Sequence, residues 1–324
     1  MNSSHATVST SAIHGPHQRV AGADPREQFL AQLFDRLWDR YRQRVSYVQT
    51  YEEVVHAAGA SFVNDHIAFR TFGCQQPMAG IATLSRIFEA LGYQAAGCYQ
   101  FPDKLLSAIH LQHPNGRFPK LFISELQVWA MDSAARETIL KSVRSHRLPI
   151  SEETLHKLHR CGDLSPADRD ALLGRVVREF HDLPWNLPEK QDVTAANRFS
   201  QYAAWVLVHG YNVNHFTSLI NSQGVPTLAD IDKTVAALSA AGVPMKTEIE
   251  GQPGSKLRQT ATEAVVINVD VTDNGVQASM PWTYAYFELA ERGEVTDPDS
   301  GRRGRFEGFL GAQATQLFEM TRTR

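Results

Sequence analysis

The same succession of secondary-structure elements is predicted twice along this chain. Residues 63–73 (VNDHIAFRTFG) and 211–220 (YNVNHFTSLI) alternate between apolar and polar side chains, as half-buried strands do. Each of these strands precedes a helical run that ends at a glycine, Gly92 or Gly242, and each helix precedes further strand-like runs. Two β-α-β-β-β modules predict an α+β fold in which the copies lie side by side, with their first and last strands around a common cavity.

The remaining strand-like runs complete the two modules. In the first module, about residues 60–130, they are residues 93–101, 105–112 and 119–128. In the second module, about residues 205–292, they are VPMKTEIE, KLRQTATEAVVINVDV and TYAYFELAER, and Thr227 is the predicted N-cap of the helix. We expect the two modules to form one curved sheet.

Three further segments surround these modules. Residues 1–24 are small and polar and lack the apolar region of a signal peptide, so they are predicted to be a disordered leader. Charged and well-capped helical runs between about 131 and 200 predict an added helical segment between the modules. Residues 293–324 form a C-terminal tail. We expect residues 25–324 to fold as one domain.

Composition excludes several classes of partner. The net charge of -3 and a charged fraction of 21% give no basic surface for nucleic acid or an anionic membrane. No apolar run approaches the roughly 18 residues that a membrane-spanning helix needs. The three cysteines, Cys74, Cys98 and Cys161, are odd in number and far apart, which is typical of reduced thiols in a cytoplasmic protein. We expect a cytoplasmic protein and leave a homo-oligomer open.

Two histidines and one glutamate predict a metal site. His66 and His215 lie inside the first strands of the two modules, and Glu288 lies in the last strand of the second. The run YAYFEL surrounds Glu288 with aromatic and apolar residues, and buried carboxylates are rare unless they are paired or bind a metal. Two imidazoles and one carboxylate leave up to three positions of an octahedral metal open for substrate and dioxygen, which suits non-haem Fe(II). A hydrogen-bonded or exposed strand histidine is the alternative for each imidazole.

Arg70 is a candidate for binding substrate. It follows His66 by four residues on the same face of the predicted strand, a distance of about 13 Å at the usual rise per residue. A guanidinium there cannot bind the metal, but it can bind the far carboxylate of a substrate whose near end chelates the metal. The alternative is a salt bridge to Asp65 or Glu125. Gln259, in LRQTAT, is a candidate for a polar contact to the same acid, or else an ordinary core or surface glutamine.

Several separated motifs resemble one enzyme family. They are NDHIAFRTFG, GYNVNHFTSL, LRQTAT, YFELAER and RFEGFLGAQATQLFEMT, in this order over about residues 50–320. These runs are similar to the 2-oxoadipate dioxygenase/decarboxylase family, also called hydroxyglutarate synthases, which is related to the vicinal-oxygen-chelate (glyoxalase-like) folds. Bacterial members for which the activity is named are longer than this chain, which resembles a shorter subgroup.

The resemblance implies which residues form the site and which metal and substrate they bind. It implies that residues 25–324 are a metal-binding catalytic domain, with Fe(II) held by His66, His215 and Glu288. It also implies that Arg70 is the catalytic arginine that anchors the substrate. The implied reaction converts 2-oxoadipate and dioxygen into 2-hydroxyglutarate and carbon dioxide, a step of lysine catabolism. The expected partners are therefore a small 2-oxo acid and O2.

Two other functions stay open from the sequence. A glyoxalase-like lyase or isomerase with Ni(II) or Zn(II) has four protein ligands, and Glu125, in the last strand of the first module, would be the fourth. A non-catalytic small-molecule binding protein of the same fold is the second alternative, since a fold alone does not fix function. A sequestering pocket, however, needs an apolar and aromatic lining and not two histidines and a glutamate.

Overall fold

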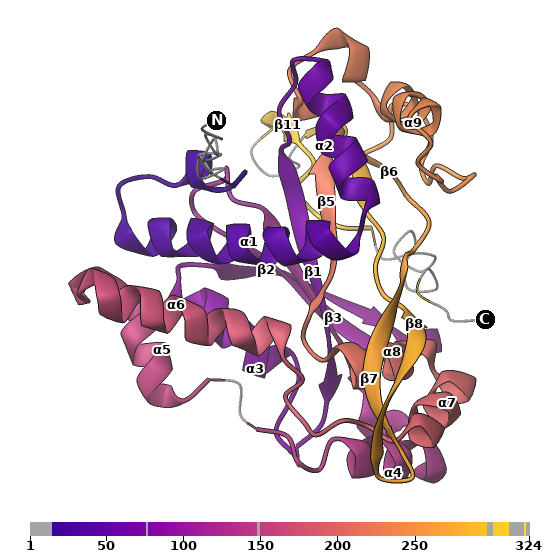
Figure 1. Cartoon of the computed structure of the whole chain (residues 1–324). Helices are drawn as coiled ribbons and strands as arrows, with labels where there is room; N and C mark the ends of the chain where they lie inside the picture. The colour runs from indigo at the N-terminus through magenta and orange to yellow at the C-terminus, as the bar shows by residue number, and fades with distance from the viewer. Residues whose placement is uncertain (1–14, 76, 148–149, 297–300, 311–320, 322–324) are drawn as a thin grey trace, which may run out of the picture.

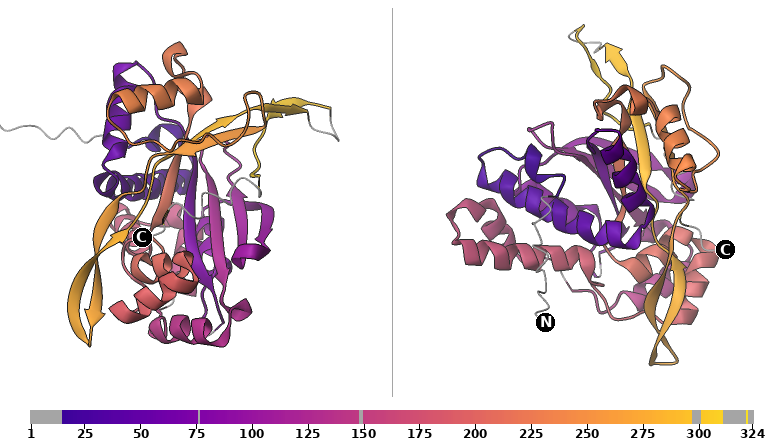
Figure 2. Two further views of the ribbon diagram at one scale, coloured as in Figure 1. Left: turned by 90° about the vertical axis from the view of Figure 1, so that its right-hand side faces the viewer. Right: turned by 45° about the horizontal axis from the view of Figure 1, so that its top comes forward.

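One curved sheet of seven strands dominates the described part of the chain (Figures 1 and 2). This computed structural model describes residues 15–75, 77–147, 150–296, 301–310 and 321. The strands of the sheet lie in the order β2-β3-β4-β1-β5-β9-β6. In that order their bounds are Gln94–Phe101, Leu106–Gln112, Lys120–Gln127, Asn64–Gly73, Val213–Leu219, Glu288–Arg292 and Leu257–Ala261.

The sheet consists of two halves that meet at β1 and β5. These two strands are antiparallel, and each has the last strand of its own module parallel on its outer side, β4 beside β1 and β9 beside β5. The next strands outward are antiparallel, β3 beside β4 and β6 beside β9. One helix follows the first strand of each half, α3 (Ile81–Ala90) or α9 (Ile231–Ala240). The predicted α+β fold, with two related modules in one curved sheet, is confirmed.

The second module departs from the predicted pattern after its helix. Residues 243–250 are not a strand in the structure, and only isolated bridges at Met245 and Glu250 connect them to the neighbourhood of β6. The side chain that caps α9 is that of Asp230, which accepts the N–H of Lys233, so the predicted cap at Thr227 is wrong. A carboxylate one residue before the helix reaches the free N–H groups of its first turn, and Thr227 lies too early to do so.

The run 256–271 is two strands and not one. It breaks after β6, and β7 (Val266–Asp273) pairs with β8 (Val276–Thr283) as a separate hairpin that extends away from the main sheet (Figure 1). Asn274 and Gly275 form the turn, both with positive φ (53° and 79°). Asn-Gly is the preferred sequence for a two-residue hairpin turn, so the chain carries a local signal for the β7–β8 hairpin.

Helices cover the sheet and, in the view of Figure 1, also lie at its lower end. The N-terminal helices are α1 (Pro25–Arg44) and α2 (Tyr47–Ala57), and Asp24 caps α1. The predicted helical segment contains α4 (Ser133–Ser142), α5 (Glu152–His159), α6 (Pro166–His181) and α7 (Lys190–Phe199). It continues into α8 (Gln201–His209), in which every residue is buried. Two short strands, β10 (Glu294–Thr296) and β11 (Arg303–Arg305), form a ribbon after β9.

The N-terminal residues that the structure describes pack against α1. The His17 imidazole is buried, and its Nδ1 lies 2.8 Å from a carboxylate oxygen of Asp35. The structure therefore differs from the predicted leader over residues 15–24, because this buried polar pair fixes the segment on the helix, while residues 1–14 lie outside the described residues. None of the described helices is both long and apolar enough to cross a membrane.

Candidate metal centre

The three predicted ligands converge in the structure. His66 on β1, His215 on β5 and Glu288 on β9 are all buried, and their ligand atoms lie within 4.8 Å of one another. The Nε2 atoms of the two imidazoles are 3.3 Å apart. The carboxylate oxygens of Glu288 lie 3.5 Å from His66 Nε2 and 3.3 Å from His215 Nε2. The three side chains form one cluster of donor atoms.

The pairing of three neighbouring strands brings these side chains together. In the antiparallel pair β1–β5, Ala68 lies opposite His215, and in the parallel pair β5–β9, Thr217 lies opposite Glu288. Side chains two residues apart point to the same face of a strand. His215 and Thr217 therefore share the face that carries His66, and Thr217 Oγ1 lies 3.0 Å from His66 Nε2.

Each histidine is held by the side chain that precedes it. Asp65 Oδ2 lies 2.8 Å from His66 Nδ1, and Asn214 Oδ1 lies 3.0 Å from His215 Nδ1. An oxygen at this position accepts the N–H of Nδ1, which leaves the lone pair on Nε2. Both Nε2 atoms thus face the cluster in the tautomer that binds a metal.

Burial sets the charge state of the cluster. Desolvation lowers the pKa of His66 and lowers the pKa of His215 well below its usual value, so both imidazoles are neutral. Burial also raises the pKa of Glu288 well above its usual range, and both carboxylate oxygens are buried without a well-formed hydrogen bond from the described residues. A cation between the three side chains would compensate this carboxylate. The donor set therefore fits a divalent metal.

The first module carries no ligand at the position that corresponds to Glu288. The residue two places after His215 pairs with Glu288 on β9, and the residue two places after His66 pairs with Phe122 on β4. Phe122 lines the cavity beside the cluster. An apolar ring thus stands where a symmetric site would have a second carboxylate.

Glu125, considered above as a fourth ligand, has another role. Its Oε2 accepts the backbone N–H of Ile81, the first residue of α3, at 2.8 Å. In the second module Glu291 accepts the N–H of Ile231, the first residue of α9, also at 2.8 Å. Glu125 lies three residues after Phe122, so its side chain points to the opposite face of β4. Glu125 and Glu291 are equivalent helix caps, and the cluster has three members among the described residues.

A cavity next to the cluster is lined by both modules. Besides the three residues of the cluster it is lined by Ala68, Phe69, Arg70, Phe122, Ser124, Asn214, Leu257, Gln259, Tyr286, Phe309 and Leu310. His66 and Arg70 therefore face the same cavity, as their spacing predicts. The cavity wall is mostly apolar, which limits the access of water to the cluster.

The Arg70 guanidinium is buried against two aromatic rings. Its carbon lies 5.0 Å from the ring centroid of Tyr202 and 5.3 Å from that of Trp205, both on α8. Its Nη1 donates to Thr321 Oγ1 at 2.7 Å. Of the salt-bridge partners considered from the sequence, Asp65 pairs with Arg292 and Glu125 caps α3.

Gln259 lies on the other side of the cavity, on β6. It is buried, and its Nε2 donates to Glu250 Oε2 at 2.8 Å. Burial raises the pKa of Glu250 above its usual value. The amide is therefore held by a neighbouring carboxyl group and still lines the cavity.

Comparison with known proteins identifies the family. A sequence model described as "2-oxoadipate dioxygenase/decarboxylase" matches residues 33–318. The chain belongs to this family. Its members are named as enzymes, so the cluster of His66, His215 and Glu288 lies in an enzyme.

Two plant members of the 2-oxoadipate dioxygenase/decarboxylase family are similar over most of their length. The rice protein is 27% identical over 320 residues, which cover 93% of this chain and 80% of the relative. The Arabidopsis thaliana protein is 28% identical over 332 residues, which cover 97% of this chain and 82% of the relative. Both are named as chloroplastic proteins, and the cytoplasmic location expected for this chain stays a prediction.

Solved structures agree with the fold. Hydroxyglutarate synthase from Oryza sativa, in complex with 2-oxoadipate, superimposes with a TM-score of 0.74 at 25% identity and covers 94% of this chain and 95% of its own. A glyoxalase superfamily protein from Ralstonia eutropha JMP134 superimposes with a TM-score of 0.77 at 24% identity, with 89% of each chain covered. The second likeness supports the glyoxalase-like fold alone.

Some residues around the site were not predicted from the sequence. They are Asp65 and Asn214 as partners of the histidines, Arg292 as the partner of Asp65, and Tyr202, Trp205, Phe309 and Thr321 in or beside the cavity. A signal for the first two was present, since each family histidine directly follows an Asp or an Asn. Arg292 follows Glu288 by four residues on β9, but its pairing with Asp65 depends on strand order. The remaining residues come from segments far from the ligands in sequence.

Proposed function

We propose that this protein is an Fe(II)-dependent dioxygenase/decarboxylase that converts 2-oxoadipate and O2 into 2-hydroxyglutarate and CO2. The observation that carries the proposal is the asymmetric cluster, with two imidazoles and one carboxylate and with Phe122 in place of a fourth ligand. Membership of the 2-oxoadipate dioxygenase/decarboxylase family supports the same substrate. In this role the enzyme would act in lysine catabolism.

Fe(II) is the metal that the donor set favours. Two histidines and one carboxylate on one face of the ion are the typical ligands of non-haem Fe(II) oxygenases. When bound, the metal supplies the dioxygen chemistry that amino-acid side chains cannot perform. His66, His215 and Glu288 would hold it, and Asp65 and Asn214 keep both imidazoles in the binding tautomer.

Arg70 would bind the distal carboxylate of the acid. The guanidinium is buried, lies close to the rings of Tyr202 and Trp205, and faces the same cavity as His66. A planar guanidinium can donate two parallel hydrogen bonds to a carboxylate, and burial strengthens them. The acid would thus lie with its 2-oxo end at the cluster and its other end at Arg70. The distance between the two sites selects a dicarboxylic acid of matching length.

Gln259 would provide a second polar contact. Its amide nitrogen carries two N–H groups, and one of them donates to Glu250. An ionised acid accepts hydrogen bonds, and we expect the second N–H of Gln259 to donate to the substrate. The apolar side chains of Phe69, Phe122 and Leu257 would keep water away from the reacting end.

The stoichiometry of the reaction defines the test. Loss of the C1 carboxyl group as CO2 oxidises the 2-oxo carbon to a carboxylate, and insertion of oxygen oxidises the neighbouring carbon to an alcohol. These two oxidations together consume one O2 and need no external reductant. With ¹⁸O2, the 2-hydroxyglutarate product should gain two labelled oxygen atoms, one in the new carboxylate and one in the hydroxyl group.

The experiment is anaerobic reconstitution with Fe(II), followed by measurement of oxygen consumption across 2-oxo monocarboxylic and dicarboxylic acids. We expect the fastest consumption with 2-oxoadipate and one CO2 released for each O2 consumed. Conversion of a substrate without O2 would instead favour the lyase or isomerase. Stoichiometric binding without any conversion would favour a binding protein.

A further inference from the structure

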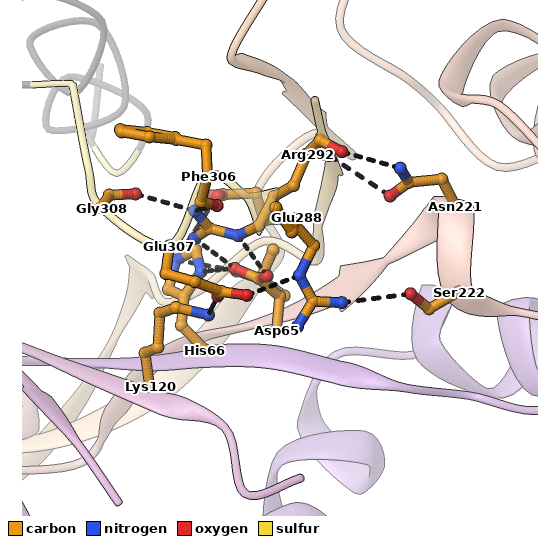
Figure 3. Close-up of polar contacts among 12 residues, drawn as sticks. Asp65, His66, Lys120, Asn221, Ser222, Glu288, Arg292, Phe306, Glu307 and Gly308 are labelled. Carbon is orange, nitrogen blue, oxygen red and sulfur yellow. Dashed lines mark hydrogen bonds and ion pairs between the residues drawn. The ribbon is translucent and has the colours of Figure 1, made fainter. Parts of the chain in front are cut away.

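Arg292 is a buried cation close to the cluster. It is the last residue of β9, four residues after Glu288, and its side chain is 0% exposed. A buried guanidinium is costly unless it is paired and hydrogen-bonded, so its partners show which parts of the structure depend on it. Figure 3 shows the guanidinium between the carboxylate of Asp65 and the backbone of residues 306–308.

One side of the guanidinium holds the partner of a metal ligand. Its Nε and Nη2 donate to the two oxygens of Asp65 at 2.5 and 2.8 Å. Asp65 Oδ2 also accepts the hydrogen bond from His66 Nδ1 at 2.8 Å. The planar fork fixes the carboxylate in one orientation. Arg292 thus determines where the acceptor of the His66 N–H lies.

The other side of the guanidinium holds a segment that covers the cavity. Its Nη1 donates to the carbonyl oxygens of Phe306 at 3.1 Å and Gly308 at 2.7 Å. We call residues 306–309 the cover segment. The Phe309 ring lines the cavity, and its centroid lies 4.9 Å from that of the His66 imidazole in an edge-to-face arrangement.

Further anchors of the cover segment come mainly from side chains. Lys120 forms an ion pair with Glu307, and Gln112 Nε2 donates to the Glu307 carbonyl at 3.2 Å. The N–H of Phe309 donates to the Tyr99 hydroxyl at 3.3 Å. Residues 306–309 belong to no strand. A segment attached in this way can open without disruption of the sheet, because few ladder hydrogen bonds hold it.

We propose that Arg292 is a positioning residue that couples the cover segment to the orientation of His66. One guanidinium holds both the Asp65–His66 pair and the cover segment. A metal that fixes His66 therefore also fixes the cover segment over the cavity, and closure of the segment in turn favours the geometry that binds the metal. The inference rests on the proposed function only in that the cluster binds a divalent metal.

The experiment compares hydrogen exchange of the cover-segment amides in the full chain without and with Co(II). In the wild type, we expect Co(II) to slow this exchange. Arg292→Lys keeps the charge but lacks the fork, so it cannot hold both oxygens of Asp65 and both carbonyls. We expect exchange in this variant to be independent of Co(II). We also expect its Co(II) affinity to fall about 10–100-fold, as when the hydrogen-bond partner of a metal ligand is lost, with changed Co(II) absorption bands.

Arg258 provides a matched control. It is also a buried arginine of the second module, and it pairs with Asp232 and Glu291 on the side of the sheet that carries α9. Arg258→Lys should lower the melting temperature. It should leave the Co(II) affinity, the absorption bands and the Co(II)-dependent slowing of exchange as in the wild type.

Each outcome decides the inference. If Arg292→Lys kept the affinity, bands and Co(II)-dependent slowing of the wild type, Arg292 would be a structural residue only. If the wild type itself did not bind Co(II), the metal site would be wrong. Should Arg292→Lys not fold, Asp65→Asn makes the same comparison. The amide oxygen of the new side chain still accepts the hydrogen bond from His66, but the ion pair between the Arg292 guanidinium and the Asp65 carboxylate is lost. Wild-type slowing in Asp65→Asn would overturn the coupling.

Discussion

The two modules hold their histidines in the same way but with different charges. Asp65 lies at Nδ1 of His66. Burial alone would raise the pKa of the Asp65 carboxyl group. The charge of Arg292 and the hydrogen bonds that the carboxylate accepts nevertheless lower this pKa well below its usual value. At Nδ1 of His215 lies the neutral amide of Asn214. An ionised carboxylate makes an imidazole a stronger electron donor than an amide does. The two imidazoles of the cluster are therefore unequal as donors, although their strands are alike.

The last strands of the two modules differ more. At equivalent positions β9 carries Glu288, the carboxylate of the cluster, and β4 carries the apolar ring of Phe122. A symmetric pair of carboxylates would complete a four-ligand site. The single substitution of a ring for a carboxylate leaves one side of the cluster open toward the cavity. A repeated fold thus yields an asymmetric site, and the asymmetry provides the space for a substrate.

Loss of the Glu288 carboxylate, which has no counterpart in the first module, should have the largest effect on metal binding. Glu288→Gln keeps the shape but loses the charge, so Co(II) affinity should fall by more than the about 100-fold that marks the upper range for loss of a ligand's hydrogen-bond partner. In the metal-free protein the same variant should be more stable at pH 8. Burial raises the pKa of Glu288 in the fold, so its ionisation costs folding free energy at pH values above its ordinary 4.5.

Titration with Co(II) measures the first effect, and melting curves of the metal-free proteins at pH 4 and pH 8 measure the second. The stability difference should vanish toward pH 4, where the unfolded chain is protonated as well. Unchanged Co(II) affinity would show that Glu288 is not a ligand.

A second carboxylate, placed on β4, should abolish oxygen consumption. Phe122→Glu places a carboxylate where β4 corresponds to Glu288 on β9. Four protein ligands leave two positions on an octahedral metal, enough for a chelating 2-oxo acid but not for O2 as well. We expect tighter binding of Zn(II) and oxygen consumption at the level of the metal-free protein. Phe122→Leu, which keeps the wall apolar, should retain both metal binding and oxygen consumption. Wild-type consumption by Phe122→Glu with its metal bound would contradict this role of Phe122.

The modules also differ four residues after the histidine, where the first has Arg70 and the second has Leu219. Arg70→Ala should impair the use of dicarboxylic acids selectively. A hydrogen bond to a charged group contributes about 1.5–3 kcal/mol, so the preference for 2-oxoadipate over 2-oxohexanoate should fall about 10–150-fold in kcat/KM. 2-Oxohexanoate has a methyl group in place of the distal carboxylate, and its kcat/KM should hardly change. Arg70→Lys, which keeps the charge, should lose less. An unaltered preference in Arg70→Ala would remove Arg70 from substrate binding.

The strands that carry the site could be predicted, because the signal for a strand is local in sequence. Alternation of apolar and polar residues located β1 and β5 and placed His66 and His215 on them. The two runs FISEL and YFELAER also located the last strands. The pair of Asp65 with Arg292 joins residues that are far apart in sequence, and it depends on strand order and register. No local periodicity encodes such a contact.

The sequence alone does not show which residues of the two last strands are equivalent, and the reason is physical. Glu125 and Glu288 each precede a leucine in the last strand of their module, so the sequence makes the two positions look equivalent. The register makes Glu125 correspond to Glu291 instead, three residues later on its strand. Because strand side chains alternate between faces, an offset of three residues moves a carboxylate from the cavity to the helix side. One sequence does not give the register, so the two glutamates could not be distinguished.

The two helix caps give the smallest expected effect and the sharpest check of this equivalence. Glu125→Ala removes the acceptor at the start of α3 and should lower the free energy of unfolding by about 0.5–2 kcal/mol, as loss of a cap does. Glu291→Ala should cost more, because Glu291 also pairs with Arg258, at 3.4 Å. Denaturant unfolding measures both. Neither variant should change Co(II) affinity, since both side chains lie on the helix side of the sheet. A marked loss of affinity in Glu125→Ala alone would instead make Glu125 a fourth ligand and favour the lyase or isomerase.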